Sequence, residues 1–115
     1  MRTPVDLVRL EAFCDGTPEG LRAVVDIFLS DTQETLTELE AAMSRGDADA
    51  VRLLAHRAGG SCAACGASTL AALLEELESA SERPPRDQPA IVRQLASEFE
   101  AIARFLRSHS EGRAI

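Results

Sequence analysis

The spacing of the apolar residues constrains the fold of this chain most strongly. Between residues 18 and 44, mainly apolar side chains recur at intervals of three and four, namely at Leu21, Val25, Phe28, Thr32, Leu36, Leu39 and Met43. An interval of three or four is the period of one face of an α-helix, whereas a half-buried strand alternates every second residue. The pattern predicts one long helix that begins at Thr17-Pro18, a typical cap and first helical residue, and ends near Arg45-Gly46.

The same signals predict four further helices. Thr3-Pro4 indicates a short helix from near residue 4, and Asp47 is expected to cap a third helix. The third helix is predicted to bury Val51, Leu54, Ala55, Ala58, Ser61, Cys62 and Cys65. A fourth helix should bury Leu70, Leu73, Leu74 and Leu77 and turn Glu75, Glu76 and Glu78 outward. After a break at residues 83–87, which contain two prolines, a last helix carries Ile91, Leu95, Phe99, Ile102 and Leu106.

These helices predict an all-α fold, because aromatic and β-branched strand signals are nearly missing. Short connections between long helices favour an antiparallel four-helix bundle with a short additional N-terminal helix. The length fits one domain over residues 1–115, with the bundle core at about 18–107. Residues 108–115 are expected to be a frayed polar tail, in which His109 is inert.

Charge and cysteine content limit the classes of partner. The 19 acidic residues exceed the 12 basic ones, the net charge is −7, and no basic stripe interrupts it. This composition argues against nucleic acid or an anionic membrane as a partner. No stretch is apolar enough for a signal peptide or a membrane span, so we expect a cytoplasmic protein. Three cysteines are an odd number and favour reduced thiols over a disulfide framework.

The most informative residues lie in the predicted third helix. At about 100° per residue, His56 falls opposite the core side, among Arg52, Gly59, Gly60 and Ala63. Glycine inside a helix costs about 1 kcal/mol relative to alanine, so two in succession need a reason. Helical side chains lean toward the N-terminus, and glycine at these positions would leave His56 open to a bulky partner.

Two other interpretations of this helix stay open from the pattern alone. Gly59 or Gly60 can be the residue that ends a helix, with His56 simply a solvated side chain in its last turn. The Cys62-Ala63-Ala64-Cys65 segment can be a metal or redox site, although both sulfurs fall on the core side and no second pair of this kind exists. Buried thiols are the better interpretation, and the zinc content of the purified protein would distinguish the two. For the protein as a whole, a helical interaction module without chemistry is a further possibility.

Several segments in order and register resemble the histidine phosphotransfer (HPt) domain family. The residues that carry the resemblance are Ala55-His56-Arg57-Ala58-Gly59-Gly60-Ser61, Gly66-Ala67, Leu70 and Leu77-Glu78, with Phe28-Leu29 and Gly46-Asp47 upstream. The resemblance spans about residues 18–106. Two positions depart from the family pattern: Ala58 replaces a leucine, and Gly59 replaces a lysine that lies near the phosphoryl group in the family. Arg52, one turn before His56, is a candidate to replace that cation.

The resemblance implies a phosphotransfer intermediate in a two-component phosphorelay. His56 would accept a phosphoryl group on Nε2 and exchange it with the aspartate of a response-regulator receiver domain. The receiver would supply Mg²⁺, while this chain needs no cofactor or metal of its own. No ATP-binding loop is present in the sequence, so a hybrid sensor histidine kinase is expected upstream. We expect a monomer, and Ile27, which lies off the core stripe, is a candidate contact for the receiver; a wider buried face is the alternative explanation of Ile27.

Overall fold

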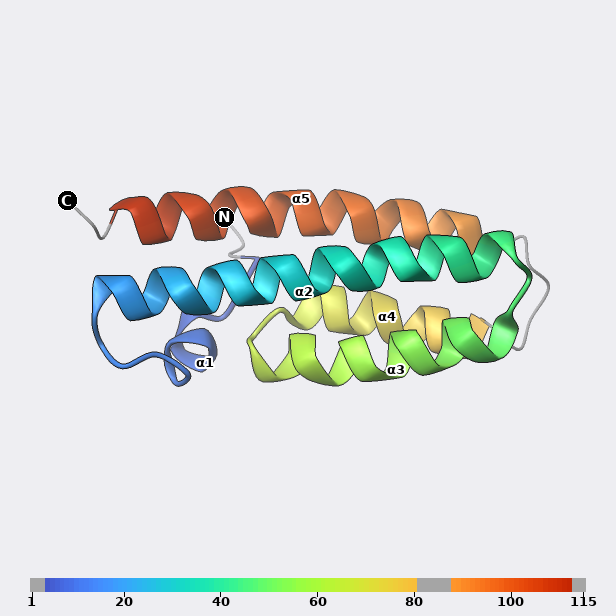
Figure 1. The fold of residues 1–115 in the computed structure, drawn as a ribbon, viewed down its shortest axis with the longest axis horizontal. Coiled ribbons are helices and arrows are strands. Elements are labelled where there is room, and N and C mark those ends of the chain that lie inside the picture. The colour runs from blue at the N-terminus through green and yellow to red at the C-terminus, as the bar shows by residue number, and fades with distance from the viewer. Residues whose placement is uncertain (1–3, 81–87, 113–115) are drawn as a thin grey trace.

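The computed structural model describes residues 4–80 and 88–112, which form five helices (Figure 1). The helices are α1 (Leu7–Glu11), α2 (Pro18–Ser44), α3 (Ala48–Ala64), α4 (Ser68–Ala80) and α5 (Gln88–Gly112). The described residues contain no strand, which confirms the predicted all-α class. The predicted break at residues 83–87 and the predicted cap at Thr3 lie outside the described residues. None of the described helices combines the length and the apolar surface needed to span a lipid bilayer.

The four long helices form an antiparallel bundle. Neighbouring pairs around the bundle are α2 with α3, α3 with α4, α4 with α5, and α5 with α2, and the α3–α4 contact is the most extensive. The edge between α3 and α4 therefore lies opposite the edge between α2 and α5 (Figure 1). The largest fully buried side chains come from every helix and include Leu10, Leu39, Val51, Leu70, Leu74, Leu77, Leu95, Ile102 and Leu106. The predicted apolar faces thus meet in one core.

The third helix presents a slightly different face to the core from the one predicted. Val51, Ala55 and Cys62 are buried as expected, whereas Ser61 is exposed. Gly59 is half-buried instead, because α4 packs against that side of α3. The buried arc is therefore rotated toward α4. A helical wheel fixes which residues share a face, but the direction from which the neighbouring helix packs decides the edges of the buried arc.

Glycine ends α3 and makes room for the N-terminal segment. Gly66 has a φ of +86°, the Gly66 N–H donates to Ala63 O, and the Ala67 N–H donates to Cys62 O, which is a Schellman motif. The N–H of Asp6 donates to Gly66 O at 2.8 Å. A Cβ atom at Gly66 would lie 2.5 Å from Asp6 O, so only glycine permits this close approach. Residues 4–6 therefore lie against the α3–α4 connection.

This approach explains why the first helix starts later than predicted. The expectation of a helix from near residue 4 is wrong, because Asp6 is in an extended conformation and caps α1, its carboxylate accepting the Val8 N–H at 3.1 Å. The Arg9 guanidinium donates to Ala63 O at 3.2 Å and holds α1 against the C-terminal end of α3. In Figure 1, α1 lies beyond that end of α3, where Leu10 completes the core.

The end of α5 also differs from the prediction. The expected frayed tail from residue 108 is wrong up to residue 112, because α5 continues to Gly112. Ser110 is buried one turn after Leu106, and the His109 ring stacks on Phe105 at 6.3 Å between centroids. His109 Nε2 lies 3.5 Å from Glu11 Oε1. The extra turn therefore makes tertiary contacts, through the burial of Ser110 and the contact of His109 with Glu11 of α1, and residues 113–115 lie outside the described residues.

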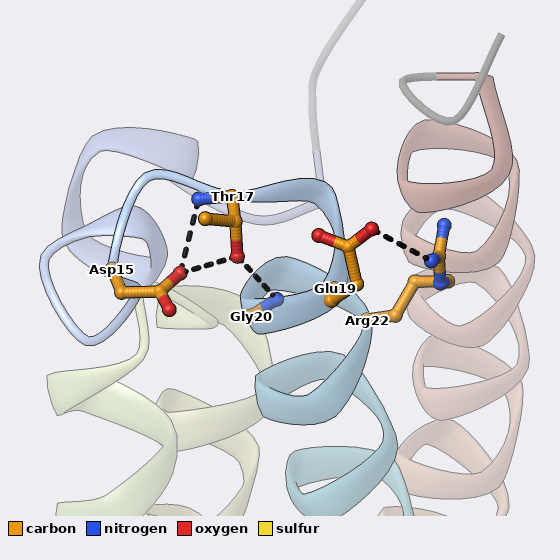
Figure 2. Close-up of polar contacts among 5 residues, drawn as sticks. All are labelled: Asp15, Thr17, Glu19, Gly20 and Arg22. Carbon is orange, nitrogen blue, oxygen red and sulfur yellow. Dashed lines mark hydrogen bonds and ion pairs between the residues drawn. The ribbon is translucent and has the colours of Figure 1, made fainter.

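A short polar network holds the N-terminus of α2 (Figure 2). The Gly20 N–H donates to Thr17 Oγ1 at 2.9 Å, as expected of the predicted cap. The Thr17 hydroxyl and backbone N–H both donate to Asp15 Oδ1, at 2.6 and 3.0 Å. These two hydrogen bonds, the hydroxyl first, hold the pKa of Asp15 below its ordinary value of 3.8. A Cβ atom at Gly20 would collide with this carboxylate.

We predict that Asp15→Asn removes an acid-sensitive part of the stability. Because the folded-state pKa of Asp15 is lowered, the ionised carboxylate stabilises the fold above its unfolded pKa, and this contribution disappears as the pH falls through the folded pKa. Urea unfolding should show a less stable variant at neutral pH and a difference from the parent that shrinks as the pH falls below the ordinary carboxyl pKa of 3.8. Glu19→Gln is the control, since the exposed Glu19–Arg22 pair at 3.9 Å should contribute little. A difference that persists at low pH would contradict this role.

Candidate functional site

His56 projects from an uninterrupted part of α3. The helix runs from Ala48 to Ala64, so Gly59 and Gly60 lie inside it and the interpretation that either glycine ends the helix is wrong. The His56 side chain is 72% exposed. The imidazole therefore projects from an uninterrupted helix. It lies at the border of the α3 face that packs against α4.

The two glycines after His56 have different surroundings. At Gly59 an added Cβ would lie 3.7 Å from Leu74 Cβ and 3.9 Å from Ala71 O, which is ordinary contact with α4. At Gly60 an added Cβ would meet nothing within 4 Å. The prediction that both face solvent therefore holds for Gly60 only. Gly59 lies where α3 and α4 approach each other, and Gly60 leaves open space on the outer side.

The main residue that the sequence analysis missed is Glu78. Its Oε1 lies 3.2 Å from His56 Nδ1, and its side chain is 34% exposed. The prediction placed Glu78 outward like Glu75 and Glu76, which are both exposed. The helix register was the signal available in the sequence. A helical hairpin that turns at Gly66 brings residues near 76 level with His56. Because the His56 side chain leans toward the N-terminus of α3, it reaches a residue slightly further along α4, which is Glu78.

A groove between α3 and α4 surrounds the imidazole. It is lined by Ala55, His56, Gly59, Gly60, Ala63, Ala71, Glu75, Glu78 and Ser79. Three of the predicted neighbours of His56, Gly59, Gly60 and Ala63, thus lie with it in one groove. The fourth, Arg52, does not line the groove, and its guanidinium contacts Asp49 Oδ1 at 3.2 Å. The groove offers two carboxylates, the imidazole and mostly small side chains.

Ile27 is 61% exposed, so the explanation of Ile27 as part of a wider buried face is wrong. The structure leaves its side chain available on α2, and its role in partner contact stays a prediction.

The cysteine pair lies at the core, as the thiol interpretation predicted. Cys62 is buried, and Cys65 is half-buried at the C-cap of α3. Burial first, and then the neighbouring Cys65, raises the pKa of Cys62 to about 12, while a hydrogen bond with Thr32 opposes the rise. Burial also raises the pKa of Cys65. Since the thiolate is the reactive form, neither sulfur is prepared to act as a nucleophile. The described residues hold no cluster of three or more His, Cys, Asp or Glu side chains arranged for a metal ion.

The described site thus consists of an exposed histidine on a helical bundle, with a carboxylate at one ring nitrogen and two glycines one turn further along α3. The family model described as "Hpt domain" matches residues 23–105, which is most of the chain. The chain belongs to the Hpt domain family and is a histidine phosphotransfer protein of a two-component phosphorelay.

A solved structure supports the same assignment. The histidine-containing phosphotransfer protein B (HptB) from Pseudomonas aeruginosa PAO1 superposes with a TM-score of 0.84 at 27% sequence identity. The match covers 96% of this chain and 97% of that one. No curated protein gives a significant match to the sequence.

We predict that Gly60→Leu stabilises the protein. The helix is continuous at Gly60 and a side chain there meets open space, so the substitution should gain helix propensity, up to about 1 kcal/mol. Urea unfolding of the purified variant measures the gain.

Gly66→Ala is the contrasting variant for this measurement. Gly66 has a positive φ and lies against Asp6, so an alanine at residue 66 should lower the free energy of unfolding by at least about 1 kcal/mol. Loss of stability in Gly60→Leu would contradict the open surroundings of Gly60.

Proposed function

We propose that His56 is the residue that carries the phosphoryl group, and that the chain exchanges it with the aspartate of a receiver domain. The observation that supports this most directly is the contact between His56 Nδ1 and Glu78 Oε1 at 3.2 Å on an otherwise open imidazole. The other histidine of the chain, His109, is half-buried between Phe105 and Glu11 at the far end of α5.

The contact with Glu78 selects the nucleophilic nitrogen. A carboxylate accepts hydrogen bonds and donates none, so the shared proton is assigned to Nδ1 of His56. The lone pair of the neutral ring then lies on Nε2, which faces away from Glu78. Glu78 is in this respect a positioning residue, because it fixes the tautomer and the orientation of the ring without touching the phosphoryl group.

The transfer step releases no proton, and the total charge of the reacting groups is the same before and after it. The Nε2 lone pair attacks the phosphorus of the receiver's aspartyl phosphate, the N–P bond forms, and the electron pair of the breaking P–O bond returns to the aspartate carboxylate. The imidazole keeps its Nδ1 proton and becomes cationic, and Glu78 Oε1 accepts the hydrogen bond from that proton throughout. The reverse step returns the phosphoryl group to an aspartate.

The partner would supply what this groove does not provide. The proposal assigns Mg²⁺ and the groups that stabilise the transferring phosphoryl oxygens to the receiver domain, and the exposed Ile27 to the contact with it. It also assigns the first phosphorylation to a hybrid sensor histidine kinase, since this chain would have no ATP site of its own. A monomer in the cytoplasm that binds neither nucleic acid nor membrane completes the proposal, and the acidic net charge of −7 favours it.

We predict that His56→Gln abolishes phosphoryl acceptance and leaves folding intact. The position is exposed, so the free energy of unfolding should change by no more than about 0.5 kcal/mol. Incubation with a phosphorylated receiver domain, followed by a test of acid lability and base stability of the label, measures acceptance. His109→Gln is the matched control and should accept normally. A label of the phosphohistidine type that persists in His56→Gln would refute the assignment.

We predict that Glu78→Ala slows acceptance about three- to tenfold, because a charge-assisted hydrogen bond to the ring is lost at a partly exposed position. Glu78→Gln keeps an acceptor oxygen and should fall between the parent and the alanine variant. Nitrogen NMR of the imidazole is the second readout: the Nδ1–H tautomer should dominate in the parent and decline in Glu78→Ala. Slow transfer with an unchanged tautomer ratio would show that Glu78 does not act through the ring.

A further inference from the structure

The described residues that line the groove around His56 carry negative charge. Glu75 and Glu78 are among them, and none of these described lining residues is an arginine. The 12 basic residues of the chain are all arginines, so no lysine is available elsewhere. Arg52 is paired with Asp49, and Arg9 donates to the Ala63 carbonyl oxygen at the end of α3.

The next residue in sequence, Arg57, does not compensate either. It lies about 100° around α3 from His56 and is not part of the groove. Among the described residues that line the groove, a phosphoryl group on His56 would therefore meet formal charge only on the carboxylates of Glu75 and Glu78.

The two carboxylates lie at different distances along the groove. Glu78 contacts Nδ1 of the ring, at the edge opposite Nε2. Glu75 is one turn earlier on α4, and because α3 and α4 are antiparallel, it lies further toward Gly59 and Gly60. Glu75 is exposed and makes no hydrogen bond or ion pair with the described residues. Its charge is therefore not neutralised by a described neighbour.

The charges of the phosphorylated ring make the two carboxylates act in opposite directions. Phosphorylation of Nε2 creates a cationic ring with its proton on Nδ1 and a phosphoryl group that carries up to two negative charges. Glu78 at 3.2 Å from Nδ1 attracts the cationic ring. Glu75 lines the same groove as Gly60, where an added Cβ would meet nothing within 4 Å, so its charge would repel phosphoryl oxygens that occupy this groove.

We propose that Glu75 destabilises the phosphoryl group on His56 and thereby biases the equilibrium toward the receiver aspartate, so that this protein acts mainly as a phosphoryl donor. The inference rests on the proposed role of His56. The balanced reaction is the one given above: the N–P bond breaks, the acyl phosphate bond forms on the aspartate, and the neutral Nδ1–H imidazole is restored.

The equilibrium constant is the informative quantity, because it depends only on the free proteins before and after transfer. Contacts within the complex change the rates in both directions equally and cancel. A change of the constant on substitution of Glu75 must therefore come from the free phosphorylated or unphosphorylated chain. An exposed unit charge near a dianion predicts a shift of about two- to fivefold at low salt, which salt should largely remove.

The experiment compares the partition of phosphoryl between the full chain and one receiver domain at equilibrium. The receiver domain is one that transfers its phosphoryl group to the parent chain. It is phosphorylated with acetyl phosphate, and the remaining acetyl phosphate is removed before the two proteins are mixed. Glu75→Gln should raise the ratio of phosphorylated chain to phosphorylated receiver about two- to fivefold. Glu76→Gln is the matched control, because Glu76 is exposed on the same helix, carries the same charge and does not line the groove. It should leave the ratio unchanged.

The outcomes separate the two proposals. An unchanged ratio in Glu75→Gln, or an equal rise in Glu76→Gln, would overturn the role of Glu75 while transfer to His56 in the parent still stands. Persistence of the rise at high salt would also overturn it, because the effect would then not be electrostatic. The proposed function would instead be overturned if no phosphorylated receiver domain transferred its phosphoryl group to the parent chain. It would also be overturned if His56→Gln still acquired a phosphohistidine label.

Discussion

The packing of α3 against α4 is the constraint on which the site depends. Gly66 ends α3 in a left-handed conformation, and α4 begins two residues later at Ser68. This short connection fixes the register of the two antiparallel helices and brings Glu78 level with the His56 ring. At Gly59 an added Cβ would make only ordinary contact with Leu74 and Ala71, so the approach of α3 and α4 does not by itself require glycine there. The groove, the ring orientation and the nearby charges all follow from that register.

The N-terminal segment stabilises this arrangement from outside the four-helix bundle. Asp6 forms a backbone hydrogen bond with Gly66, and Arg9 donates to the Ala63 carbonyl, so α1 holds the connection that sets the register. The last turn of α5 in turn packs near α1 through His109. These contacts join both terminal helices to the structural unit that contains the site.

The described charges around His56 bear on the proposed function. A phosphoryl group on His56 would lie in a groove whose described lining residues include two carboxylates and no arginine or lysine, and charge repulsion would make it less stable than a phosphoryl group beside a cation. The contact between His56 Nδ1 and Glu78 would act in the other direction, because it would attract the cationic ring and leave Nε2 available. Under the proposed function the site would hold a phosphoryl group for a short time, and a modest stability of the bound state would suit an intermediate.

The sequence by itself determined the helices, the all-α class and the exposed histidine, because helical periodicity and capping residues such as Thr17 and Asp47 are local properties of the chain. The tertiary structure alone decided the rest. Glu78 became the partner of His56 through the α3–α4 register, and Asp6 rather than Thr3-Pro4 began α1 because Gly66 binds its backbone. Residues 108–112 are helical, with Ser110 buried and His109 beside Glu11. Each of these depends on contacts between residues distant in sequence, which no local pattern contains.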